Sequence, residues 1–215
     1  DRDLIVKVRS TEFFYQTMTL LWIITFCIAF TINFRPLYWW FVEHEQLASL
    51  LDLSSVTLKQ MYQTLLAYLN YPWISKLTLD ISISYDAMRH FEDVKRLFLI
   101  NYSLLFITTV PTWYYLTNLI KQKKVWILRQ KIVLCLYVLS VILVCLVLDF
   151  ERFFVFFHKL LFTEQNWIFD PQIDPIILVL PSDFFLACFV LFIVLFVGIL
   201  LFFLYLGKKQ LKQLS

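Results

Sequence analysis

The sequence is poor in glycine and in charged residues, and each shortage excludes a class of protein. Glycine occupies 2 of 215 positions, which is too few for the Gly-rich loops that bind nucleotide phosphates. Charged residues make up 16% of the chain and hydrophobic residues 60%, against about 25% and about 45–50% in soluble domains. The composition therefore predicts an integral membrane protein, for which we expect no cofactor and no nucleic-acid partner.

Long apolar runs predict the number of membrane spans. A helix needs about 20 apolar residues to cross about 30 Å of hydrocarbon. Four segments meet this requirement: residues 14–34, 97–120, 132–150 and 184–206. We therefore predict an all-α polytopic membrane protein, a single domain over residues 1–215 with four transmembrane helices. We expect the first span to be retained rather than cleaved as a signal peptide.

The distribution of charge predicts the orientation in the membrane. The two terminal segments and the loop between the second and third spans carry 11 basic and 3 acidic residues. Segments 35–96 and 149–183 carry 8 basic and 13 acidic residues. Because lysine and arginine accumulate on the cytoplasmic side, we place both termini in the cytoplasm and the two acidic segments on the extracytoplasmic face.

The first outer segment, residues 35–96, is predicted to form a small α+β unit. Apolar residues recur at the spacing of one helix face from Leu58 to Leu69, with Ser55 or Thr57 as the N-cap. Apolar and polar residues alternate strictly over residues 77–84, LTLDISIS, which predicts a short strand. Ser84 is then expected to cap a helix that continues into the second span.

The second outer segment, residues 151–183, is aromatic and apolar but too short to cross the membrane. It contains His158 and Trp167, followed by Asp-Pro turns at Asp170 and Asp174. We predict that it forms a loop lying in the membrane interface between the third and fourth spans.

The candidate catalytic side chains are the three histidines, all of which fall in the outer segments. His44 lies between two glutamates and is expected on the surface. Asp86, His90 and Asp93 share one helix face, which places an imidazole between two carboxylates. Such an imidazole can act as a general base, and an ordinary helix-surface ion pair is the alternative. For His158 the alternative is a packing role, in which its ring fills space among the aromatic side chains at the membrane interface.

Thiol and metal chemistry are not expected on the outer side. All four cysteines, Cys27, Cys135, Cys145 and Cys188, fall in the predicted spans. The sequence has no H-x-x-x-H motif, no HExxH motif and no cysteine cluster, so we predict no metal site.

Two groups of residues resemble signatures of a known family. The first is HFEDVK at residues 90–95, directly before the second span. The second comprises Phe157, His158, Trp167, Pro171, Asp174, Pro181, Phe184 and Phe185. Together with the four-span layout, they resemble the lipoprotein intramolecular transacylase (Lit) family of Gram-positive bacteria over nearly the whole chain. One departure is Asp183, because the family has a carboxylate closer to Pro181.

The resemblance implies an acyltransferase of the bacterial cell membrane. Its partners would be membrane lipid and a lipoprotein whose N-terminal cysteine carries diacylglycerol on sulfur and a free α-amine. The sn-2 acyl chain would move to that amine and give a lyso-form lipoprotein. Because the nucleophile and the ester belong to one molecule, no acyl-enzyme is needed.

The resemblance and the chemistry of the residues together give a hypothesis for each role. His90 is expected to be the general base and acid, with Asp93 or Asp86 orienting it. His158 is expected to hydrogen bond to the ester or to the tetrahedral oxyanion. The residues expected to bind substrate are Tyr85, Asp86 and Trp167.

Three other functions stay open at this point. In a non-catalytic scaffold or accessory subunit of an envelope complex, the histidines would tolerate substitution. An intermolecular lipoprotein N-acyltransferase usually forms an acyl-enzyme, for which Ser82, Ser84 and Ser182 are candidate nucleophiles. A transporter is disfavoured because no charged residue lies deep in a span.

Overall fold

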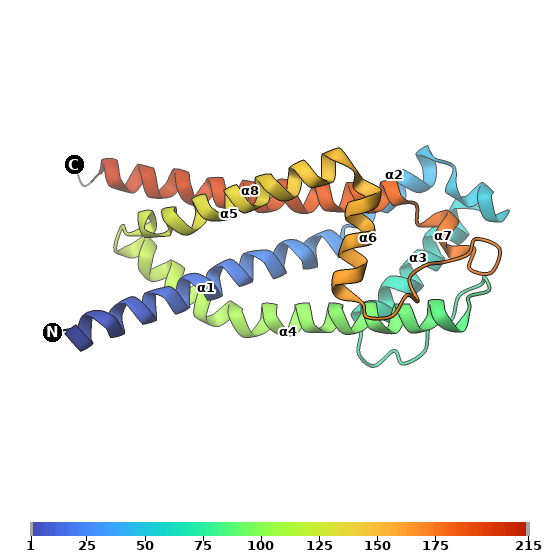
Figure 1. Ribbon diagram of the computed structural model, residues 1–215, viewed down its shortest axis with the longest axis horizontal. Helices are drawn as coiled ribbons and strands as arrows, with labels where there is room; N and C mark the ends of the chain where they lie inside the picture. The colour runs from blue at the N-terminus through green and yellow to red at the C-terminus, as the bar shows by residue number, and fades with distance from the viewer. Residues whose placement is uncertain (1, 214–215) are drawn as a thin grey trace. The chain divides into compact units, whose positions relative to one another are not determined.

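The computed structural model describes residues 2–213, with side chains from Ser10 onward, and all regular elements in this part are helices (Figure 1). Four of them form the apolar helices long enough to cross a membrane: α1 (Arg2–Asn33), α4 (Tyr85–Lys121), α5 (Arg129–Leu148) and α8 (Ser182–Lys212). The four predicted spans are therefore confirmed. The basic residues counted above for the orientation include Arg2, Lys7 and Arg9, whose side chains lie outside the described part.

Shorter helices connect the spans, and contacts group the chain into two compact units. The shorter elements are α2 (Arg35–His44), η1 (Leu47–Leu51), α3 (Ser55–Asn70), η2 (Val125–Leu128), α6 (Phe150–Leu161) and α7 (Ile176–Val179). The first unit contains the chain up to Ala29, Asn101–Val144 and the chain from Leu191 onward. The second unit contains Phe30–Ile100 and Cys145–Val190, and it includes both predicted outer segments.

Polar contacts between helices supplement the apolar core of the first unit. The Trp22 indole N–H donates to the Thr109 hydroxyl at 2.9 Å. The Asn101 amide donates to the Thr25 carbonyl oxygen at 3.1 Å. Such bonds are favourable in a membrane because lipid offers polar groups no partner.

The core of the second unit joins α2, α3, α7 and the start of α4. Tyr38 is 1% exposed and its hydroxyl donates to the Val179 carbonyl oxygen at 2.9 Å. Leu58, Met61 and Leu65 on the predicted face of α3 are buried against the same core. The predicted amphipathic helix is therefore confirmed, although its N-cap is Ser54, whose hydroxyl accepts from the Thr57 N–H at 3.0 Å, rather than Ser55 or Thr57.

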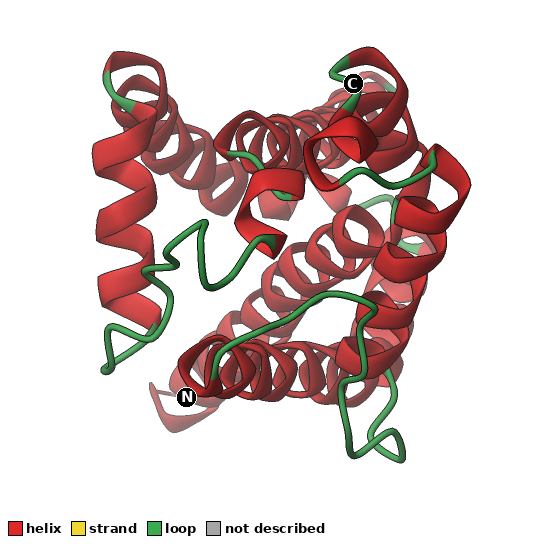
Figure 2. Ribbon diagram, turned by 90° about the vertical axis from the view of Figure 1, so that its right-hand side faces the viewer, coloured by secondary structure: helices red, strands yellow, loops and turns green. Residues whose placement is uncertain are grey.

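The predicted strand over residues 77–84, and with it the α+β character of the first outer segment, is wrong. The described residues include no strand, and this segment is a loop between α3 and α4 (Figure 2). The alternation does mark burial, because Leu77 is buried and Leu79, Ile81 and Ile83 pack against the core. A strand also needs a neighbouring strand for its backbone bonds, and here the apolar side chains pack on helices instead.

Candidate active site

The first turns of α4 position His90. The Ser84 hydroxyl accepts from the Ala87 N–H at 3.1 Å, so the predicted N-cap is confirmed. Asp174, which is 4% exposed, accepts from the Ser84 N–H at 2.6 Å and from the Ser84 hydroxyl at 2.9 Å. Asp174 therefore ties the second outer segment to the start of the helix that carries His90.

His90 lies outside the apolar part of α4. The helix has 37 residues, which corresponds to about 55 Å, whereas a bilayer core of about 30 Å takes about 20 residues. Its first twelve residues, 85–96, hold six charged side chains, and the apolar sequence begins at Leu97. His90 is nevertheless only 7% exposed, because side chains of the second outer segment cover it.

The α6 helix positions His158. The Asp149 carboxylate caps this helix by accepting from the Arg152 N–H at 3.0 Å. One turn before the histidine, the Phe154 carbonyl oxygen lies 2.8 Å from His158 Nδ1. Because a carbonyl oxygen only accepts, Nδ1 carries the proton and Nε2 is left as the basic nitrogen.

The two histidines face each other within an aromatic enclosure. Their ring centroids are 6.0 Å apart. Phe162 lies 4.7 Å from the His90 ring and 5.7 Å from the His158 ring. Trp167 lies 4.9 Å from His158, and Phe169 lies 5.6 Å from His90. A small polar group placed between the imidazoles would therefore be surrounded by apolar rings.

Asn166 is a site residue that sequence reasoning missed. It is 7% exposed, and its amide Nδ2 donates to Asp93 Oδ2 at 3.3 Å. The other carboxylate oxygen of Asp93 accepts from Arg96 at 3.2 Å. Asp93 is thus connected to the site through Asn166. The sequence offered little signal, because Asn166 follows a second amide, Gln165, in a polar stretch directly before Trp167.

Burial keeps both imidazoles uncharged at neutral pH. The pKa of His90 is lowered to about 4, mainly by burial and also by His158, against the opposing effects of Asp93 and Asn166. Burial likewise lowers the pKa of His158, while its bond to the Phe154 carbonyl acts in the opposite direction. Two neutral imidazoles side by side can accept protons from a bound amine.

Other candidate residues lie apart from this cluster. Tyr85 is 72% exposed, and Asp86 is exposed in the first turn of α4. His44 is exposed as expected and stacks on Trp40 with ring centroids 4.5 Å apart. Among the described residues, no group of three His, Cys, Asp or Glu side chains could hold a metal ion.

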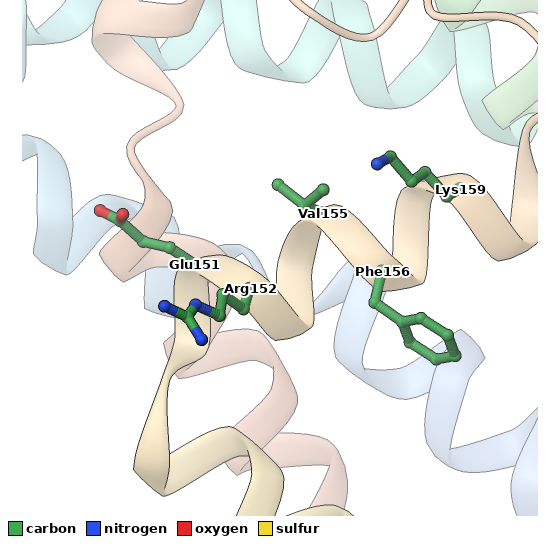
Figure 3. Close-up of a pocket in the computed structure, with 5 residues that line it drawn as sticks. All are labelled: Glu151, Arg152, Val155, Phe156 and Lys159. Atoms are coloured by element: carbon green, nitrogen blue, oxygen red, sulfur yellow. The ribbon is translucent and has the colours of Figure 1, made fainter.

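A shallow pocket lies on the charged face of α6 (Figure 3). It is lined by Glu151, Arg152, Val155, Phe156 and Lys159, all of which come from this one helix. None of the residues around the two imidazoles lines it, so it is separate from the histidine site.

Comparisons with known proteins agree with this architecture. The sequence profile of the lipoprotein intramolecular transacylase Lit matches residues 13–185. No curated protein matches the chain. The membrane-integral lipoprotein intramolecular transacylase Lit from Bacillus cereus has a similar structure, with 25% sequence identity and a TM-score of 0.88 over 95% of this chain and 96% of that chain.

Two further solved structures are variants of the same Bacillus cereus protein. In one of them a histidine is replaced by arginine, with 24% identity and a TM-score of 0.79 over 99% of this chain and 96% of that chain. In the other a histidine is replaced by alanine, with 24% identity and a TM-score of 0.80 over 98% of both chains. The profile match and the shared fold show that this chain belongs to the lipoprotein intramolecular transacylase Lit family of membrane acyltransferases.

Proposed function

We propose that this chain moves the sn-2 acyl chain of an S-diacylglyceryl-cysteine to the α-amine of the same cysteine, with His90 and His158 as proton acceptors. Family membership makes the chain a multi-pass membrane acyltransferase. The observation that supports the finer proposal is the pair of buried imidazoles, 6.0 Å apart between ring centroids, inside an aromatic enclosure.

The proton balance of the reaction explains why two bases are useful. An α-amine has a pKa of about 8, so at neutral pH it is mainly an ammonium group. Forming the amide removes two protons from that nitrogen. One of them ends on the glycerol oxygen and the other passes to solvent, so the reaction needs two acceptors during each turnover.

The two histidines supply these acceptors in sequence. In place of the hydrogen bond to the ester or oxyanion expected from the sequence, we assign proton transfer to His158. Its Nε2 takes the first proton and leaves a neutral amine, which attacks the ester carbonyl. His90 takes the second proton from the attacking nitrogen as the C–N bond forms. The His158 imidazolium then donates its proton to the departing glycerol oxygen as the C–O bond breaks. His90 finally releases its proton to water, which restores both neutral rings.

The aromatic enclosure contributes positioning and exclusion of water. Phe162 contacts both imidazoles, and Trp167 contacts His158. Rings at these positions can hold the cysteine and glycerol groups folded on each other, which is the geometry that an intramolecular attack requires. A dry site also protects the ester from hydrolysis. We propose that Trp167 shapes this aromatic enclosure. Tyr85 and Asp86 are proposed to bind substrate at the exposed start of α4.

The hydrogen bonds and exposure of the three candidate serines favour direct acyl transfer without an acyl-enzyme. The Ser84 hydroxyl donates to Asp174 and accepts from the Ala87 N–H. Both bonds hold this hydroxyl in a structural role, as the N-cap of α4. Ser82 and Ser182 are exposed rather than held beside an imidazole. We infer that the substrate amine is the only nucleophile.

The membrane placement follows from the charge distribution. The excess of lysine and arginine in the tails and in the loop after α4 favours cytoplasmic termini. The histidine site would then lie at the extracytoplasmic end of α4. A lipoprotein anchored in the outer leaflet presents its acylated cysteine at that level.

Mass spectrometry of a synthetic diacylglyceryl lipopeptide tests this function. Purified protein in liposomes is expected to leave the mass unchanged while fragment ions show one acyl chain on the amine. His90→Asn and His158→Asn are expected to lower the rate by about 100-fold or more, because general acid–base catalysis contributes about 10²- to 10⁴-fold. His44→Asn is the matched control, because His44 is exposed and lies outside the enclosure. Normal product formation by the first two variants would overturn the assignment.

A further inference from the structure

Two buried polar atoms of the site lack partners, and they belong to side chains close enough for Asn166 to affect the pKa of His90. His90 Nδ1 and Asn166 Oδ1 both have no hydrogen bond, and both residues are 7% exposed. Buried polar atoms in folded proteins are almost always hydrogen bonded, so a pair of this kind in one site needs an explanation. The proposed proton transfer requires one of the two His90 nitrogens to be unprotonated, and the partner of Nδ1 decides which one.

The hydrogen bond from Asn166 to Asp93 fixes the direction of the Asn166 amide. A carboxylate only accepts hydrogen bonds, so the Asn166 NH₂ group must face Asp93, as it does at 3.3 Å. The Asn166 carbonyl oxygen therefore points away from Asp93 and can only accept. An imidazole nitrogen that faces this oxygen forms a favourable contact only when it carries a proton.

We propose that Asn166 is a positioning residue, whose Oδ1 accepts the Nδ1 proton of His90 and so leaves His90 Nε2 as the nitrogen that takes a proton from the substrate. Asp93 acts through Asn166 by holding the amide in this direction. The inference deepens the proposed function and rests on it for the role of His90.

The arrangement gives both histidines the same tautomer. The Phe154 carbonyl oxygen holds the Nδ1 proton of His158, and the Asn166 amide oxygen would hold the Nδ1 proton of His90. Both acceptors are neutral, so neither stabilises an imidazolium as strongly as a carboxylate in direct contact would. Burial and His158 keep the pKa of His90 low against the raising effects of Asp93 and Asn166, so the ring can release its proton after each transfer.

The tautomer can be measured without any activity. Nitrogen NMR of histidine-labelled protein distinguishes a protonated from an unprotonated Nδ1, and the chain has only three histidines. In the His44→Gln background, two imidazoles remain. We expect the proton of His90 on Nδ1 in the wild-type site and a mixture of tautomers in Asn166→Ala. A His90 proton on Nε2, or a tautomer that does not change in Asn166→Ala, would overturn the proposal.

Kinetics on the diacylglyceryl lipopeptide provide the second test. Asn166→Ala and Asp93→Asn are each expected to lower kcat by about 10- to 100-fold with little change in KM, because the population of the reactive tautomer falls. The double variant should be no slower than the slower single variant, since both act on one contact. Gln165→Ala is the control, because this amide is next in sequence but exposed, and it should retain wild-type rates. Additive losses would contradict the proposal.

The Asn166→Asp variant separates positioning from simple structural support. It keeps an acceptor oxygen but adds a negative charge beside His90, which favours the imidazolium. The acid limb of the pH profile of kcat should therefore move upward by about one pH unit or more. An unchanged profile would contradict the proposal. If the wild-type protein transfers no acyl chain, the proposed function fails, whereas the tautomer measurement still decides the role of Asn166.

Discussion

Asp174 connects the loop before α7 to the start of α4, and replacing it should weaken the second unit. Its two carboxylate oxygens accept from the Ser84 N–H at 2.6 Å and from the Ser84 hydroxyl at 2.9 Å, and the residue is 4% exposed. Ser84 in turn caps the helix that carries His90. A change at Asp174 therefore affects the fold and the site together.

The two bonds set the expected loss of stability. Hydrogen bonds to a charged group contribute about 1.5–3 kcal/mol each, and because Ser84 is only half-buried we take the lower part of that range. Asp174→Ala should therefore reduce the free energy of unfolding by about 3 kcal/mol. Asp174→Asn keeps an acceptor for the Ser84 N–H, and its NH₂ can donate to the Ser84 hydroxyl, so the loss should be about 1 kcal/mol.

Thermal unfolding in detergent measures this difference. For a chain of this length 1 kcal/mol corresponds to about 2–4 °C in Tm, so Asp174→Ala should lower Tm by about 6–12 °C and Asp174→Asn by about 2–4 °C. Asp183→Asn is the control, because this carboxylate is exposed in the first turn of α8, and its Tm should stay within about 2 °C of wild type. Equal shifts for the alanine and asparagine variants would refute the reasoning about the two bonds.

Two further predictions concern pH and the loop after α3. Because the pKa of His90 is depressed to about 4, the unfolded chain binds a proton that the folded chain does not, so the free energy of unfolding should fall by about 2 kcal/mol between pH 7 and pH 5. The Tm of His90→Gln should fall less over this interval, and an equal fall would contradict the prediction. Lys95 donates to the Ile74 carbonyl oxygen and lies 4.3 Å from the Tyr68 ring centroid, so Lys95→Met should lower Tm by about 3–6 °C at neutral pH. An unchanged Tm would show that this lysine does not hold the loop.

Properties that depend on local sequence could be predicted well. Hydropathy located all four spans because a helix in lipid needs an uninterrupted apolar stretch. The apolar spacing identified the buried face of α3, and Ser84 was recognised as a cap from its place before a helical pattern. In each case the signal and the structure it specifies lie within one continuous segment.

The strand prediction failed because alternation reports burial rather than pairing. Leu77, Leu79, Ile81 and Ile83 do turn toward the core, which is all that the pattern requires. Whether such a segment pairs with another strand depends on a partner elsewhere in the chain. In the described residues the neighbours are helices, and nothing local in residues 77–84 specifies this.

The site could be predicted only in part, because it is assembled from two distant segments. Helical spacing placed Asp86, His90 and Asp93 on one face, yet the second outer segment buries His90, reaches Asp93 through Asn166 and leaves Asp86 exposed. No spacing rule relates His90 to His158, so their contact emerges only from the fold. Asn166 belongs to no recognisable sequence motif, and it joins the site through its hydrogen bond to Asp93 on α4.

A crossover experiment tests the central claim most directly. Wild-type protein in liposomes is given an equal mixture of two diacylglyceryl lipopeptides, one with deuterated acyl chains and a different peptide mass. Transfer within one molecule predicts that each N-acylated peptide carries only its own acyl chain, with no mixed product above the background of a His90→Asn sample. Mixed products, or a peptide that gains a third acyl chain, would show transfer between molecules and contradict the proposed reaction.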